Sequence, residues 1–163
     1  MMSVKTVKVW NGTAWVNSGP AQLAAPIASA VTQSSSFGGA GVASATLASI
    51  SDGIPEPFVA TLFSNLEWLQ VEFTAASYVT SITIGASTNT GGWAAIYING
   101  ARLQISDDGV LWSDVAVLAG FTNAAGSTYT GTSIQTITVG RNARYMRVVM
   151  TGEYLAIGEF TAI

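Results

Sequence analysis

The stretch of residues 103–115 constrains the fold of this chain more than any other. Apolar Leu103 and Ile105 alternate with polar neighbours, which is the period of a strand that buries one face. Asp108-Gly109 then supplies the positive φ angle that a tight hairpin needs. The pattern predicts a strand that enters, turns and leaves.

Side chains within this hairpin serve the turn. Trp112 is placed to fold back over it and bury its indole ring, and the oxygens of Ser106, Asp107 and Asp108 can accept from free backbone amides. Together with Asp114, these carboxylates could also form the acid pair of a glycosidase. The chain contains no histidine or cysteine, and no basic partner stands near the pair, so turn chemistry is the simpler interpretation.

The Ser-Asp-Asp-Gly-x-x-Trp pattern of residues 106–112 resembles the middle of a discoidin domain, the coagulation-factor type C module of the galactose-binding-like superfamily. Three further stretches follow the order of that family: Ser51-Asp52-Gly53, the WLQVEF of residues 68–73 and the ARYMRV of residues 143–148. The resemblance covers residues 34–163 and implies an all-β fold, an antiparallel β-sandwich with a discoidin-like jelly roll.

Hydrophobic alternation agrees with that fold. It predicts short strands bounded by turn residues and no long amphipathic helix, which is typical of an all-β sandwich. We expect the arginines of residues 144–147 to serve the interior, one of them by pairing with a carboxylate such as Glu72. The predicted strands, besides the central hairpin, are residues 68–73, 80–84, 95–99, 134–139, 144–150 and 155–163.

The first 33 residues form a separate arm and linker in this interpretation. Residues 4–10 and 15–17 alternate as strands around Asn11-Gly12 and predict a β-hairpin, whereas residues 18–33 contain glycine and proline without a sustained period and predict a linker. The VWNGTAWV wording of the hairpin resembles short modules of bacteriophage tail and fibre proteins, where such a hairpin lies near the attachment end.

The amino-acid composition limits the kinds of partner that we expect for this chain. Only 9% of the residues are charged while 49% are hydrophobic, so we expect part of the surface to be covered by copies of the chain in a homo-oligomer or by a larger assembly. The formal net charge of −3 excludes the basic surface that binding to nucleic acid requires.

Other absences exclude several classes of chemistry and location. Without cysteine and histidine there is no disulfide framework, no Ser-His-Asp triad and no ordinary zinc site. The first ten residues lack the apolar core of a signal peptide, and no apolar run is long enough to span a membrane. We therefore expect synthesis in the host cytoplasm without export or membrane insertion.

Asp52 and Glu159 are the candidate metal ligands. Discoidin-like carbohydrate modules often hold a structural calcium between the Asp-Gly loop and a glutamate of the last strand, and these two residues stand at the matching positions. Carbonyls of residues 50–55 could complete an all-oxygen shell. The alternative is that Glu159 faces solvent or pairs with an arginine, and the insert Pro55-Glu56-Pro57 departs from the family loop.

The resemblance places sugar sites on loops at one end of the sandwich. Sugar recognition needs an aromatic face and planar hydrogen-bonding side chains, and Asn89, Trp93, Arg102 and Tyr129 are of these types. As alternatives, Trp93 caps the core and Arg102 merely flanks a strand. Members of the family from blood insert apolar loop tips into anionic membranes, which requires surrounding basic residues that this chain lacks.

These observations leave three functional hypotheses. The first is a non-enzymatic phage or phage-like virion protein, a fibre, decoration or adhesion module whose arm binds other virion proteins and whose jelly roll binds host-surface glycans. The alternative is a free bacterial carbohydrate-binding module or lectin. The third is an enzyme, which would lose its activity in Asp107→Asn and Asp108→Asn.

Overall fold

The computed structural model describes residues 8–10, 15–17, 26–36, 47, 50–53, 55, 59–87, 97–125 and 128–163, with the first two of these segments described by backbone alone. Nine strands and no α-helix occur among these residues. The strands are β1 (Lys8–Trp10), β2 (Trp15–Asn17), β3 (Ala28–Gln33), β4 (Val59–Ala60), β5 (Glu67–Ala86), β6 (Arg102–Ser106), β7 (Ser113–Val117), β8 (Ile134–Met150) and β9 (Ala156–Ala162).

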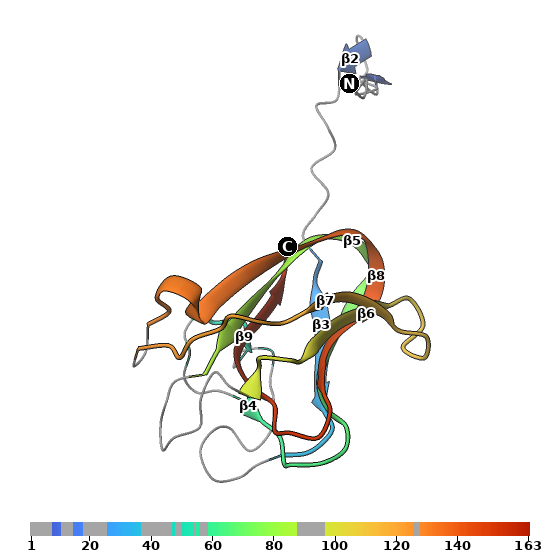
Figure 1. Ribbon diagram of the computed structural model, residues 1–163. Helices are drawn as coiled ribbons and strands as arrows, with labels where there is room; N and C mark the ends of the chain where they lie inside the picture. Colours follow the sequence, from blue (N-terminus) through green and yellow to red (C-terminus); the bar gives the residue numbers. More distant parts are fainter. Residues whose placement is uncertain are drawn as a thin grey trace.

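The seven-stranded sheet is antiparallel and has the order β4-β9-β5-β8-β6-β7, with β3 also paired to β5. Its two long strands, β5 and β8, belong to both layers (Figure 1). The first half of β5 pairs with β3 and the end of β8, whereas its second half pairs with β9 and the start of β8. The sheet therefore curls into a sandwich, and the predicted all-β fold is confirmed.

Irregular pairing explains how the two long strands change layers. The register between β5 and β8 shifts between Glu72 and Ser77 and again between Val79 and Ser81, and Gly140 of β8 adopts a φ of +68°. Such bulges bend a strand without ending it. The predicted pairs of strands at 68–73 with 80–84, and at 134–139 with 144–150, are thus one continuous strand each, because the residues between them remain extended.

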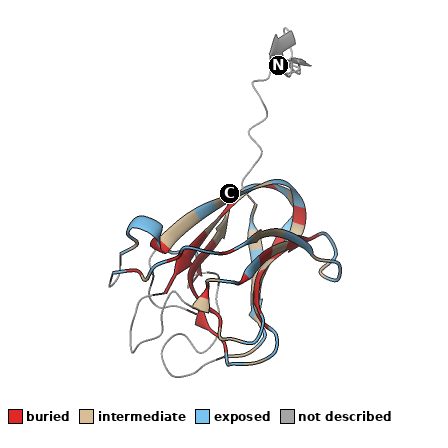
Figure 2. Ribbon diagram, viewed as in Figure 1, coloured by how far each residue is buried: buried red, intermediate tan, exposed pale blue. Residues whose placement is uncertain are grey.

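The core lies between the two layers (Figure 2). The predicted apolar face of residues 68–73 is buried: Leu69, Val71 and Phe73 are each 1% exposed. Ile82 and Ile84 line the other layer and are fully buried. Alternation along both halves of β5 thus directs one set of side chains into a common core.

The N-terminal segment contains both predicted and unexpected strands. β1 pairs with β2 through Trp10 and Trp15, which confirms the hairpin. β3 occupies residues that the sequence analysis assigns to a linker, and its Val31 pairs with Val71 of β5. Its ASAVTQ sequence is short and rich in small residues, so its pattern alone does not distinguish it from a linker.

Two predicted strands differ from the observed structure at their ends. β9 ends at Ala162 and begins at Ala156, one residue inside the predicted start at residue 155. The strand predicted over residues 95–99 begins outside the described residues, and residues 98–100 form a turn in which Gly100 has a φ of +94°. The Asn99-Gly100 turn is therefore confirmed.

Candidate functional site

The hairpin between β6 and β7 has the turn chemistry predicted for it. Gly109 has a φ of +75°, and Asp108 Oδ1 accepts hydrogen bonds from the amides of Val110 and Leu111 at 2.8 Å each. The amide bonds from Leu111 and Val110 lower the pKa of Asp108. Asp108 is consequently an ionised turn residue and is unsuited to act as a general acid.

Trp112 folds back over the hairpin as predicted. Its Nε1 donates to the carbonyl of Gly109 at 3.1 Å, and the guanidinium carbon of Arg147 lies 3.9 Å from the ring centroid. Arg147 Nε donates to Gln104 Oε1 at 2.7 Å. The ring is half-buried, and this cation–π contact fastens the hairpin to β8.

Asp114 extends this polar network on the outer face of β6 and β7. Gln104 Nε2 donates to Asp114 Oδ1 at 2.6 Å, and Arg102 donates to Oδ2 at 2.6 Å. The hydrogen bond from Gln104 and then that from Arg102 lower the pKa of Asp114. Asp114 thus links Gln104 and Arg102 on the surface. Neither Asp108 nor Asp114 is arranged to act as a catalytic acid.

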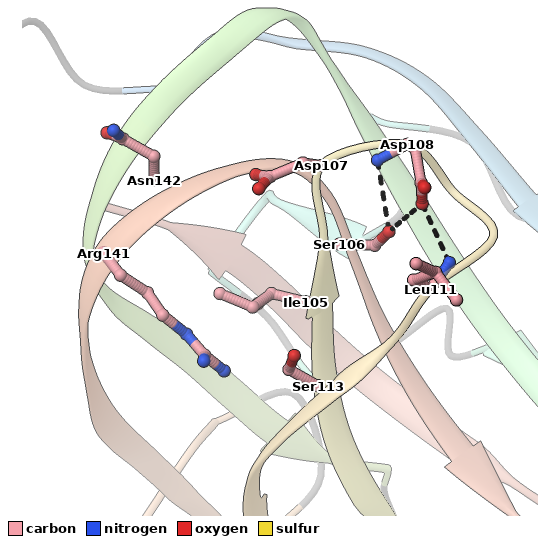
Figure 3. A pocket seen from close by; sticks show the side chains of 8 residues that line it. All are labelled: Ile105, Ser106, Asp107, Asp108, Leu111, Ser113, Arg141 and Asn142. Atoms are coloured by element: carbon pink, nitrogen blue, oxygen red, sulfur yellow. Dashed lines mark hydrogen bonds between the residues drawn. The ribbon is translucent and has the colours of Figure 1, made fainter.

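A polar hollow of about 250 Å³ lies beside the hairpin (Figure 3). Its walls come from the hairpin loop and from the bend of β8 that follows Gly140, and its floor includes Ile105, which is 3% exposed. The lining residues are Ile105, Ser106, Asp107, Asp108, Leu111, Ser113, Arg141 and Asn142. Sequence reasoning missed Arg141 and Asn142, because only the bend of β8 brings them to the hairpin.

The two predicted metal ligands lie close enough to interact electrostatically. Glu159, on β9, is 4% exposed, and its Oε2 accepts from the amide of Gly53 at 2.9 Å while Thr161 donates to its Oε1. Burial raises the pKa of Glu159, the bonds from Thr161 and Gly53 oppose that rise, and the negative charge of Asp52 adds to it. Glu159 thus does not face solvent, and no ion pair joins it to an arginine among the described residues.

Tyr129, predicted to bind ligand, packs against this acidic pair. A Cβ atom at Gly158 would lie 2.7 Å from Tyr129 Oη, and one at Gly85 would overlap the ring. Burial raises the pKa of Tyr129, and the charges of Glu159 and Asp52 raise it further. Because neither glycine has a side chain, the Tyr129 ring can pack directly on the backbone of β5 and β9.

The four predicted ligand-binding residues are not gathered into one pocket by the described part of the chain. Asn89 and Trp93 lie outside the described residues. Arg102 lies on the outer face of β6, with a side chain 59% exposed, whereas Tyr129 lies over β5 and β9. The expected Glu72 pair is present, since Arg144 donates to Glu72 Oε1 at 2.8 Å.

An aromatic cluster at one end of the sandwich escaped the sequence analysis. Tyr154 packs edge-on against Phe63 and against Tyr97, with centroid distances of 5.5 and 5.4 Å. Phe63 is 57% exposed, and its neighbours Leu62 and Leu66 are 47% and 53% exposed. The loops after β4 and β8 that carry Phe63 and Tyr154 lie at the end opposite the C-terminus (Figure 1). Sequence showed apolar loop residues here but gave no sign that they are exposed together.

Comparison with known proteins identifies the family to which this architecture belongs. Residues 30–160 match the F5/8 type C domain family. No curated protein matches the chain significantly. The described residues include no helix of the length and apolar character that crossing a membrane requires.

Solved structures of binding modules and lectins share the fold. A fucolectin from the serum of striped bass, Morone saxatilis, has a TM-score of 0.62 and 21% identity over 82% of this chain and 45% of its own. A chitosan-binding module from a chitosanase/glucanase of Paenibacillus sp. IK-5 has a TM-score of 0.56 and 20% identity over 82% and 92%. A fucose-binding module of Streptococcus pneumoniae has a TM-score of 0.55 and 15% identity over 85% and 92%.

Proposed function

Because the chain belongs to the F5/8 type C domain family, we propose that it is a non-catalytic carbohydrate-binding domain. The observation that carries the proposal is the aromatic cluster of Phe63, Tyr97 and Tyr154, which we call the loop-end site; Phe63 is exposed and the two tyrosines are half-buried beside it. The fold is that of proteins named as fucose-binding, chitosan-binding and fucolectin, and a binding role fits a chain in which Asp108 and Asp114 of the hairpin are engaged in turn and ion-pair contacts.

The loop-end site has the chemistry that sugar binding requires. Aromatic rings offer apolar faces to the C–H groups of a pyranose, and phenolic hydroxyls offer hydrogen bonds at their edges. Asn89 and Trp93 belong to the segment that leads into Tyr97, so we propose that they contribute to this site. We propose that Arg102 and Tyr129 contact only a longer glycan, one that extends beyond the loop-end site.

A glycan array tests this function. The full chain is expected to retain a defined set of glycans, and Tyr154→Ala is expected to lose them because both of its ring contacts disappear. Tyr78→Ala is the matched control, since Tyr78 is 39% exposed but lies at the bend of β5. Equal retention by both variants would place binding elsewhere, and no retention by the parent would refute carbohydrate binding.

We also propose that Asp52 and Glu159 hold a calcium ion. Glu159 is buried beside a second carboxylate, and no arginine pairs with it within the described residues, so a cation would relieve the electrostatic cost of this pair. Carboxylate oxygens suit calcium, and the proposed carbonyls of residues 50–55 would fill further positions. Its role would be structural, joining the Asp-Gly loop to β9.

Finally, we propose a place in a phage or phage-like virion, where the chain would act as a fibre, decoration or adhesion module. The support is the separate β1–β2 hairpin with its paired tryptophans, since so small a hairpin needs a surface to pack on. Copies of the chain and other virion proteins are the proposed partners. A free bacterial lectin is the alternative, and it would be a monomer for which the hairpin is dispensable.

Light scattering separates these two roles. The full chain is expected to form a defined oligomer that a version beginning at Pro26 does not form. The truncation starts at Pro26 because β3 begins at Ala28 and belongs to the sheet. Monomers in both cases would favour the free lectin.

A further inference from the structure

The hollow beside the β6–β7 hairpin is distant from the loop-end site. Asn142, on its rim, pairs with Tyr78 of β5, whereas the loop carrying Phe63 immediately precedes β5, which begins at Glu67. Tyr78 lies eleven positions after Glu67 on β5, which corresponds to about 36 Å of strand at about 3.3 Å per residue, although the bend between Glu72 and Ser77 shortens the direct distance. A ligand in the hollow would therefore occupy a separate site.

The walls of the hollow carry unused hydrogen-bonding groups. Arg141 has one contact, from its guanidinium to the carbonyl of Asp114 at 3.4 Å, which leaves most of its five N–H donors available. Within the described part of the chain, the side chains of Asp107, Ser113 and Asn142 form no hydrogen bond. A carboxylate, a guanidinium and a hydroxyl thus border one space, whereas the Asn142 side chain points away from the hairpin (Figure 3).

The balance of charge and the size of the space define the ligand class. Asp107 and Arg141 carry opposite single charges on the two sides, and the charge of Asp108 is held by the backbone amides of the turn. The space is smaller than the roughly 300–1,000 Å³ of pockets for drug-sized ligands. Leu111, which is 76% exposed, provides an apolar side.

We propose that this hollow is a second carbohydrate site, which takes one neutral sugar ring. Adjacent hydroxyls of the ring would donate to Asp107 and accept from Arg141, with Ser113 able to do either, and the C–H face would lie on Leu111. Anionic and cationic sugars fit less well, since each would face one like charge. The inference rests on the proposed carbohydrate function but not on the loop-end site.

Two separated sites would change what one chain can do. A domain with both sites would bind a branched or densely displayed glycan at two points, and the second contact would raise the apparent affinity without new residues. A single chain would also link two glycan chains.

Amide chemical shifts of the full chain test the second site. D-galactose, L-fucose and N-acetyl-D-glucosamine are titrated separately to about 100 mM, which detects binding weaker than millimolar. At least one sugar is expected to shift the amides of Asp107, Ser113, Arg141 and Asn142. Arg141→Met should weaken that binding about tenfold, since charge-assisted hydrogen bonds are lost.

Arg144→Met is the matched control. Arg144 is also an arginine of β8 and pairs with Glu72, but it does not line the hollow, so the affinity of this variant should stay within about twofold of the parent. Shifts at the hollow with this pattern support the second site. Shifts confined to residues 62–66, 97–99 and 152–155 would overturn it and leave the loop-end function standing; an absence of shifts in both places would overturn both.

Discussion

At the scale of single residues, Glu67 shows how hydroxyl groups stabilise a buried carboxylate. Glu67 is 3% exposed, and the hydroxyls of Ser34 and Ser35 each donate to its Oε2 at 2.5 Å. Burial alone would raise the pKa of Glu67, but bonds from Ser34, Ser35, Ser64 and Thr61 outweigh it and lower the pKa. Four hydroxyls from two segments are thus organised around one charge.

Glu67→Gln should destabilise the fold at neutral pH by about 1–3 kcal/mol, because an amide replaces a charged acceptor of several bonds. The folded-state pKa of Glu67 is lowered, so its contribution is complete above the unfolded value of about 4.3 and is lost as pH falls through the folded value. Urea unfolding at pH 7 and near pH 3 measures this. A difference between parent and variant that stays constant with pH would contradict the account.

Tyr129 and Gly85 should behave as a coupled pair. Gly85→Ala is expected to cost about 1–3 kcal/mol of unfolding free energy, because the new methyl group overlaps the Tyr129 ring. In a Tyr129→Ala background the same substitution should cost much less. A double-mutant cycle by urea unfolding measures the coupling, and additive effects would show that the ring does not rest on Gly85.

How well the sequence predicts the contacts of a single residue depends on how far apart along the chain the two partners lie. The turn roles of Asp108 and Gly109 follow from neighbours in the chain, and so they were predictable. The bond from Gly53 to Glu159 joins residues 106 positions apart; only the family resemblance placed them together. No local sequence pattern predicted the hydroxyls around Glu67 or the packing of Tyr129 on the two glycines.

At the scale of elements, the β6–β7 hairpin is attached to β8 mainly through Trp112 and Arg147. Arg147→Met keeps an apolar side chain over the ring but removes the cation–π contact and the bond to Gln104. We expect a loss of about 0.5–2 kcal/mol in urea unfolding. Arg102→Met removes an exposed ion pair and should cost clearly less; equal losses would contradict this ranking.

The long strands mark the limit of sequence reasoning for elements. Each half of β5 and of β8 shows alternation, so both halves were predicted, but Ala75-Ala76-Ser77 and Gly140 look like turns. Whether such residues reverse the chain or bend it depends on partner strands, because bulges are defined by pairing. β3 was missed for the same reason, since its partner β5 decides its conformation.

At the scale of the whole molecule, the proposed calcium ion should raise stability. Saturating calcium at about 100 times its dissociation constant stabilises a single-site native state by about 2.7 kcal/mol. We expect a higher melting temperature in calcium than in chelator, and no difference in Glu159→Gln. Glu153→Gln is the control, and an unchanged melting temperature of the parent at saturating calcium would refute the site.

The overall architecture was predictable because four motifs, in order, carried the family resemblance and alternation supplied the strands. For the proposed binding site, the sequence predicted only the kind of side chain that it contains. Its aromatic cluster joins residues from three distant loops, and the exposure of Phe63 is a property of the assembled sandwich rather than of any local pattern.

The measurement that tests the central claim most directly is the amide chemical-shift map of the full chain with a glycan retained on the array. The account predicts that the largest changes fall on residues 62–66, 97–99 and 152–155 around Phe63, Tyr97 and Tyr154, and that Tyr154→Ala abolishes them. Binding that leaves these amides unmoved would contradict a loop-end carbohydrate site.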